Sequence, residues 1–576
     1  FYKFRDEAQL SYNFNYGTGT TVYQGENRFS LKGIQFFQNV IELKKKDKFF
    51  IRAYSTQEDA GKSYDAVLTA FKMNDIIYGP EKEWNNAYSA LWTKAPFRFA
   101  NAFQNAAGFD VNAPYFDSAY YANEYQQILK DYNVLLREFH DSLLGIQDAS
   151  YQRPLPGTSQ YDSLFNAVTS KTFTEGGSRF YDKSALYHIM GEYQFHPTWA
   201  DIRIGGNYRW YRPNSQGSIF DEVIPSSIVT DDQGNIISQE YRRITNEEFG
   251  AYAGIERKFW DDKFKTSATL RMDKNQNFDF LFSPALSLVY EINSKHLIRA
   301  SLGRAIRNPT LQDQYLRYDV GRAILLGNIN GYDSLVSIES FDYYRSQSQL
   351  SKENLDFFNV APIEPERVTT FEIGYRGSLF KRLFLDLNYF YSWYTNFIGY
   401  QFGLDLTFDQ TLTDRVLGLQ AYRVAANARD LVTTQGLNIG ANCYINDHIT
   451  LNGNYSFNIL DLRGSDNPII PAFNTPKNKF NIGLSGRGYK FLSESKNTFG
   501  FATTYKWVEG FRFEGSPQFS GYINSYGLLD AQLSYAIPDW FITLKVGSSN
   551  VLNNKVYQVY GGPSVGRLAY ISLLFF

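Results

Sequence analysis

The chain has 576 residues and a formal net charge of -2, with 57 basic and 59 acidic side chains interspersed along it. This balance provides no basic surface for nucleic acid, so no nucleic-acid partner is expected. Aromatic residues reach 17%, yet the mean hydropathy is -0.38. No apolar run approaches the about 18 residues that a transmembrane helix needs. The combination is typical of a polar-lined β-barrel with aromatic girdles.

Alternation of apolar and polar residues between turn residues predicts about eighteen strands. In chain order they lie near 5–16, 27–45, 49–58, 184–196, 199–213, 244–260, 263–276, 281–293, 296–309, 365–380, 382–399, 427–445, 449–462, 477–489, 497–514, 524–537, 541–553 and 564–576. After Arg382, for example, Leu385 and Leu387 alternate with Asp386 and Asn388. Charged residues at alternate positions fit a wet lumen, whereas a dry core forbids them.

Short and long connections alternate strictly between these strands. The short ones are 46–48, 197–198, 261–262, 294–295, 381, 446–448 and 538–539. The long ones are roughly 59–183, 214–243, 310–364, 400–426, 463–476, 515–523 and 554–563. This pattern predicts an all-β fold, a transmembrane antiparallel up-and-down barrel with its short turns on the periplasmic side. Aromatic residues at the short turns would form the periplasmic girdle: Phe195, Trp199, Trp260, Phe380 and Trp540.

The segment 59–183 is expected to be a large extracellular loop that is partly helical. Apolar residues recur there at helical spacing, at Tyr125, Ile128, Leu129, Tyr132, Leu135, Leu136, Phe139 and Leu143. Such a loop could fold over the barrel mouth or hold a partner, or it could merely cap the rim. The sequence leaves these alternatives open.

The last strand, 564–576, ends the chain on an aromatic residue. One of its faces carries Leu568, Tyr570, Leu574 and Phe576, with Ser572 as the polar interruption. In a membrane barrel the last strand closes on the first, so we expect this face to point outward and meet lipid. A C-terminal aromatic strand of this kind resembles the signal read by the barrel-insertion machinery, and these four apolar residues would carry that signal.

Several weaker patterns do not support chemistry. The pentapeptide 562–566 matches the G-x-S-x-G pattern of hydrolases, but a strand follows Ser564 where that chemistry needs a helix. The five histidines are scattered without metal-ligand spacing, and Cys443 sits inside an alternating strand as a small apolar residue. No phosphate loop or dinucleotide fingerprint occurs. We therefore expect no enzyme activity, no cofactor and no metal site.

Three groups of motifs resemble a known family. The sequence SLGRAIRNPT at 301–310, followed by PERVTTFEIGY at 365–375, resembles the paired barrel motifs of TonB-dependent outer-membrane receptors. The tail from Asn550 to the C-terminus, with GGPSVGR at 561–567, is similar to the closing hairpin of that family. The segments 17–29 and 49–65 resemble the version found in Bacteroidetes-type receptors, some of which are SusC-like transporters.

The resemblance implies a barrel of about twenty-two strands that surrounds an N-terminal plug. The sequence shows about eighteen strands and neither a plug nor a TonB box. We therefore expect residues 1–576 to be the C-terminal barrel portion of a longer multi-pass protein of the bacterial outer membrane. The implied partners are outer-membrane lipid, TonB acting through the missing N-terminal region, and a SusD-like surface lipoprotein or another subunit of an outer-membrane complex.

The function that follows from the resemblance is TonB-dependent active uptake of a bulky nutrient such as a siderophore, a glycan or a peptide. Aromatic loop residues could face this substrate or pack within the loops: Trp84, Trp92, Tyr315, Tyr318, Tyr343 and Tyr344. Two other hypotheses remain open. The chain could be a passive porin of eighteen strands, or a structural barrel subunit of an outer-membrane assembly.

Overall fold

The computed structural model describes the chain except residues 5–6, 25–26, 80, 95–132, 152–153, 233–235, 322, 348, 411–413, 463–472, 491–493, 516–519 and 576. The chain divides into two compact units. The first comprises residues 1–63, 180–230 and 237–576, and the second comprises 64–179 and 231–236. Among the described residues, no helix is both long enough and apolar enough to cross a membrane.

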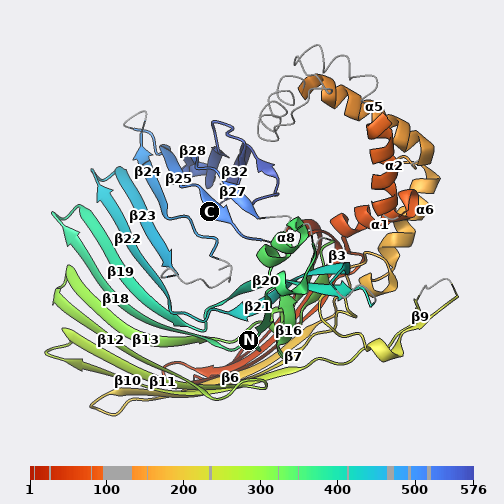
Figure 1. Cartoon of the computed structure of the whole chain (residues 1–576). Coiled ribbons are helices and arrows are strands. Elements are labelled where there is room, and N and C mark those ends of the chain that lie inside the picture. The colour runs from red at the N-terminus through yellow and green to blue at the C-terminus, as the bar shows by residue number, and fades with distance from the viewer. Residues whose placement is uncertain are drawn as a thin grey trace. The chain divides into compact units, whose positions relative to one another are not determined.

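One large antiparallel sheet dominates the first unit, and its strands follow one another in chain order (Figure 1). Within the described residues its eighteen long strands are β2 (Gln9–Gln24), β3 (Arg28–Lys45), β4 (Phe49–Asp59), β6 (Ala185–Phe195), β7 (Asp201–Arg212), β10 (Asn246–Phe259), β11 (Phe264–Asn275), β12 (Leu281–Asn293), β13 (His296–Arg307), β18 (Glu366–Leu379), β19 (Leu383–Thr395), β22 (Val432–Tyr444), β23 (Ile449–Asp461), β24 (Asn478–Tyr489), β25 (Thr498–Val508), β28 (Tyr526–Ile537), β29 (Ile542–Ser549) and β32 (Leu568–Phe575). All eighteen predicted strands are confirmed.

The two ends of this sheet are β2 and β32. In the part of the chain that the structure describes, these two strands do not pair with each other, and the two-residue strand β1 (Tyr2–Lys3) adds to β2. A contact nevertheless joins the two ends on the loop side, where the Arg28 guanidinium donates to the carbonyl of Gly561. The first long hairpin and the last loop are therefore in contact.

The two faces of the sheet differ in polarity. On one face the Asp386 carboxylate binds two guanidiniums from neighbouring strands, Arg299 at 2.9 Å and Arg376 at 2.7 Å. The opposite face of the same strand presents the half-exposed rings of Tyr389 and Trp393. We call the first the lumen face and the second the outer face. The predicted alternation of polar and apolar side chains is therefore confirmed.

The short turns have the geometry of tight hairpins. Phe380 and Lys381 both take positive φ values, 52° and 62°, which is the backbone of a type I′ turn. The aromatic residues next to these turns are exposed: Phe195, Trp199, Trp260, Phe380 and Trp540. Two connections on the opposite, loop side are also short, 25–27 and 276–280, so the predicted alternation of short and long connections is not strict.

A second sheet lies almost wholly in the segments predicted as the loops 310–364 and 400–426, with β20 beginning at Ile398 and β21 ending at Asn427. Its order is β14-β15-β21-β20-β16-β17, built from β14 (Arg317–Asp319), β15 (Ile324–Leu326), β16 (Tyr332–Val336), β17 (Phe357–Val360), β20 (Ile398–Phe408) and β21 (Val416–Asn427). The helix α7 (Leu311–Tyr315) precedes β14, and α8 (Ile338–Ser346) lies between β16 and β17. Leu325 and Val424 are fully buried in it, so this loop sheet has a packed apolar core. The prediction of plain loops here was wrong.

The remaining short strands of the first unit form hairpins at loop tips. They include β26 (Phe511–Phe513) with β27 (Gly521–Ile523), and β30 (Val556–Tyr557) with β31 (Ser564–Val565). Ser564, from the G-x-S-x-G pattern, thus lies in a short strand of the last long loop.

Helices build the second unit: α1 (Ala66–Tyr78), α2 (Glu81–Lys94), α5 (Asn133–Tyr151) and α6 (Ser159–Ser170). Asp65 caps α1, because its Oδ1 accepts the backbone N–H of Val67 at 2.8 Å and of Leu68 at 2.9 Å. The predicted helix is confirmed from residue 133 onward. Its first four predicted positions lie outside the described residues: Tyr125, Ile128, Leu129 and Tyr132.

The orientation predicted for the last strand was wrong. Ser572 pairs with Lys545 and Tyr570 with Gly547, so Leu568, Tyr570 and Leu574 lie on the lumen face. The outer face carries Ala569, Ile571, Leu573 and Phe575 instead. Both faces of this strand are apolar, so alternation alone does not indicate which face meets lipid. Phe576 lies outside the described residues.

Candidate binding site on the lumen wall

A row of side chains crosses five neighbouring strands at one level of the lumen face. The pairing registers place them directly opposite one another, from β4 to β11: Tyr54, His188, Arg209, Glu248 and Asn275. Directly opposed side chains in antiparallel strands have Cβ atoms about 5 Å apart. The alternating sequence thus brings an imidazole, a guanidinium and a carboxylate together on one wall.

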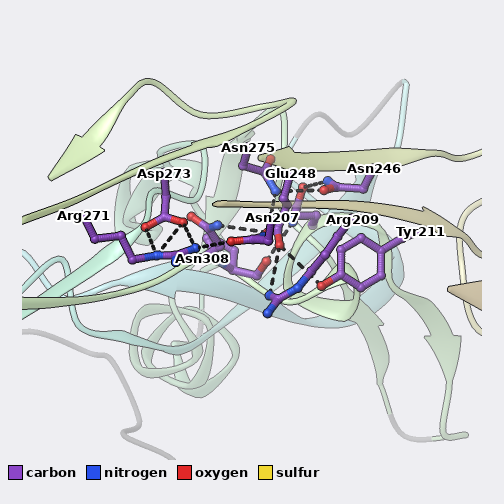
Figure 2. A network of polar contacts seen from close by, with 11 residues as sticks. Asn207, Arg209, Tyr211, Asn246, Glu248, Arg271, Asp273, Asn275 and Asn308 are labelled. Atoms are coloured by element: carbon purple, nitrogen blue, oxygen red, sulfur yellow. Dashed lines mark hydrogen bonds and ion pairs between the residues drawn. The ribbon is translucent and has the colours of Figure 1, made fainter. Parts of the chain in front are cut away.

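Glu248 is the centre of a hydrogen-bond network (Figure 2). Its Oε1 accepts amide N–H groups from Asn275 and Asn308, each at 2.9 Å. Its Oε2 accepts the Tyr211 hydroxyl at 3.4 Å and lies 3.6 Å from Nη1 of Arg209. The closest partners of this carboxylate are therefore neutral amides, and the contact with Arg209 is longer than a hydrogen bond.

A second charged group adjoins this network. Arg271 Nε donates to Asp273 Oδ2 at 2.8 Å, and Arg271 Nη2 donates to Asn207 Oδ1 at 2.7 Å, two strands away (Figure 2). The guanidinium crosses the intervening strand β10 at Gly250. A Cβ at this position would lie 2.3 Å from Arg271 Nη2 and 2.4 Å from Asp273 Oδ1. Only glycine leaves room for this bridge.

The helix α7 attaches the following loop to the same wall. Thr310 and Asp313 form a capping box, with Asp313 N–H donating to Thr310 Oγ1 at 3.1 Å. The buried Gln314 then presents its Oε1 to the amides of Asn246 at 3.2 Å and Asn277 at 2.7 Å. Loop and wall are thereby held together at the loop end of the strands.

These groups line a cavity of about 870 Å³, and its walls include His188, Asn207, Arg209, Arg271 and Asn308. This volume is within the range of pockets that bind small molecules. A second cavity of about 1030 Å³ runs along β2, β3 and β4, and the two share Tyr211, Leu311 and Gln312. The second cavity reaches Asp182 outside the strands, where burial raises the pKa of the carboxyl group. Among the described residues, no cluster of three or more His, Cys, Asp or Glu is arranged to hold a metal ion.

Three of the aromatic residues predicted to face substrate lie in the loop sheet or in α8. Tyr318 is 3% exposed, and Tyr344 is 2% exposed with its hydroxyl donating to the carbonyl of Asp414. Both rings therefore pack inside the loop sheet. Tyr343, on α8, is 56% exposed and remains accessible.

The other three lie elsewhere. The hydroxyl of Tyr315 accepts the amide N–H of Asn277 at 2.6 Å and so joins the lumen-wall network. Trp84, in the second unit, stacks on Tyr88 with ring centroids 5.3 Å apart. Trp92 belongs to α2, but its side chain lies outside the described residues. Sequence reasoning missed the residues of the row itself, for which alternation within a strand was the available signal.

A family described as "TonB dependent receptor-like, beta-barrel" matches residues 2–553. Three solved structures share the fold. A mutant ferric enterobactin receptor from Pseudomonas aeruginosa is 12% identical, with 98% of this chain and 67% of that chain covered and a TM-score of 0.54. The FrpB iron transporter from Neisseria meningitidis is 11% identical, with 99% of this chain and 70% of that chain covered and a TM-score of 0.52. The copper transporter OprC is 11% identical, with 98% of this chain and 68% of that chain covered and a TM-score of 0.54.

A comparison with curated protein sequences found no match. The solved structures are too dissimilar in sequence to indicate more than the fold. The family match, by contrast, extends over nearly the whole chain, and its members are outer-membrane proteins. Together with the paired strands and the polar lumen face, it places the chain in the outer membrane. The chain belongs to the TonB-dependent receptor-like β-barrel family.

Proposed function

We propose that this chain forms the barrel of an energised uptake system that admits a bulky polar solute across the outer membrane. The observation that carries the proposal is the cavity of about 870 Å³ on the lumen wall, lined by converging amides, guanidiniums and carboxylates. Hydrogen-bonding groups of this density suit a siderophore, a glycan or a peptide better than an apolar solute. The polar network around Glu248 holds these groups in place before a solute arrives.

TonB would drive entry by acting on an N-terminal plug outside the printed sequence. We also propose that the first barrel strands precede residue 1, which would complete a barrel of about twenty-two strands. The covered shares of 67% to 70% of the three solved structures support a longer protein. The SusC-like subtype and its SusD-like lipoprotein partner remain predictions, which co-purification of a stoichiometric lipoprotein would support.

The energised mechanism is tested by uptake in cells with and without TonB. Cells that express the complete receptor would receive iron-loaded siderophores, oligosaccharides or peptides, each carrying a radioactive label. For the correct solute we expect binding at the surface in both strains but accumulation only where TonB is present. Equal accumulation in both strains would contradict the proposal and favour the passive porin. Ion conductance of the purified complete receptor in a planar bilayer would point in the same direction, because a plugged barrel should stay closed.

A further inference from the structure

His188 is a buried polar side chain without a partner. Its exposed fraction is 6%, and neither of its ring nitrogens has a hydrogen-bond partner among the described residues. The ring of Tyr54 packs edge-on against the imidazole, with centroids 4.9 Å apart, which fixes the position of the ring. Because an unpartnered buried polar group costs about 1–3 kcal/mol, a hydrogen-bonding partner at this position would be favourable. The side chain lines the 870 Å³ cavity.

Two neighbours in this cavity also have capacity to bind. Arg209, directly opposite His188 in the next strand, lies 3.6 Å from the Glu248 carboxylate, which is already bonded to two amides at 2.9 Å. The Arg209 side chain is 40% exposed, and its guanidinium can take a second, closer anion. Asn308 donates to Glu248, whereas its own Oδ1 is buried and without a partner among the described residues.

We propose that His188, Arg209 and Asn308 form a subsite for a hydroxy acid, a solute group that carries a carboxylate beside a free hydroxyl. Arg209 would pair with the carboxylate. The hydroxyl has one hydrogen and two lone pairs, so it can accept the N–H of a neutral His188 and donate its hydrogen to Asn308 Oδ1. The inference rests on the proposed uptake function and narrows its solute to acidic siderophores and acidic glycans.

Citrate and tricarballylate test this subsite, because they carry the same three carboxylates and only citrate has the hydroxyl. Binding of each acid to the complete receptor in detergent would be measured by titration calorimetry. We expect citrate to bind at least tenfold more tightly than tricarballylate. His188→Leu should reduce citrate affinity to the level of tricarballylate, whose own affinity stays unchanged and reports an intact fold. Arg209→Gln should weaken both acids.

A matched control is His448→Leu, because His448 lies in a short turn where its ring bonds to the carbonyl of Arg487 at 2.9 Å. This variant should keep the tenfold preference. Equal affinities in the unmodified chain, no binding of either acid, or a preference that survives His188→Leu would each overturn the inference. TonB-dependent uptake without hydroxy-acid preference would leave the proposed function standing. A preference for citrate together with TonB-independent uptake would support the subsite and contradict the proposed function.

Discussion

The hydroxyl of Tyr570, in the last strand, donates a 2.8 Å hydrogen bond to Gln532 Oε1, two strands away. The ring reaches that far because Gly547 lies between them, where a Cβ would be 2.5 Å from the hydroxyl. The bond holds Tyr570 on the lumen face. The neighbouring residues Ile571 and Leu573 consequently point to the outer face, beside Val546 and Leu544.

This orientation predicts a large effect for one substitution in the last strand and a small effect for the adjacent one. Ile571→Arg places a charge on the outer face and should destabilise the barrel by about 2–4 kcal/mol if it lies near the bilayer midplane. Ser572→Glu, one residue further on, faces Lys545 and should be neutral within about 1 kcal/mol. Urea unfolding of the barrel in lipid vesicles measures both. A larger loss for Ser572→Glu than for Ile571→Arg would mean that the faces are reversed.

The Arg271 bridge gives a second prediction, at Gly250. Gly250→Ala would push the Arg271 guanidinium away from Asn207, because the new Cβ would overlap Nη2. We expect the unfolding free energy to fall by about 1–2 kcal/mol. The loss of a hydrogen bond to a charged group lowers it, and the smaller backbone entropy of the unfolded chain with alanine partly offsets that loss. Gly440→Ala is the matched control in β22, since its nearest atom would be 3.8 Å away. Equal unfolding midpoints for the two variants would contradict a bridge that depends on glycine.

How far the fold can be predicted from sequence depends on the length of the elements. Strands of eight residues or more repeat the apolar and polar alternation enough times to be recognised, as Leu385, Asp386 and Leu387 show. Four strands of the loop sheet are only three to five residues long, for example β15 at Ile324–Leu326, whereas β20 and β21, with 11 and 12 residues, were missed despite their length. β15 forms a short hairpin with the equally short β14, and its other partner is β21, which pairs with it in parallel from far along the chain.

The candidate site was less accessible to sequence reasoning. His188 lies in an alternating strand, and nothing around it in the sequence distinguishes it from His296. Its neighbours in the site, Arg209 and Glu248, lie in two other strands, and only the pairing register brings all three side chains to the same level of the wall. Aromatic composition pointed instead to Tyr318 and Tyr344, whose rings fill the core of the loop sheet. Composition alone does not separate packing residues from binding residues.

A pH dependence is expected at the short turn that contains His196. Its Nδ1 bonds to Asp201 Oδ1 and its Nε2 to the carbonyl of Asp47, both at 2.7 Å. The Asp201 carboxylate, and after it the Asp47 carbonyl, raise the pKa of His196 above its ordinary value. Since the folded-state pKa is raised, the stabilisation is complete below about pH 6.5 and is lost as pH rises through the folded-state pKa.

Histidine-selective NMR titration measures this shift directly. Asp201→Asn removes the negative partner and should bring the pKa of His196 down toward its ordinary value, with the turn otherwise intact. The turn 46–48 should also respond to the protonation of His196, because the Asp47 carbonyl accepts the second hydrogen bond of the imidazole. An unchanged titration midpoint in Asp201→Asn would show that the ion pair is absent in solution.

The unpartnered state of His188 predicts an unusual stability effect. His188→Leu replaces two buried ring nitrogens that lack partners with an apolar side chain, so the unfolding free energy should stay unchanged or rise, by up to about 1–3 kcal/mol. His296→Leu is the comparison, because Nδ1 of His296 bonds to the Tyr375 hydroxyl at 2.7 Å and its loss should cost about 1 kcal/mol. Urea unfolding in vesicles without added solute measures both variants. A loss for His188→Leu that equals or exceeds that of His296→Leu would show that the imidazole already has a partner in the unliganded barrel, so that no binding capacity remains there for a solute.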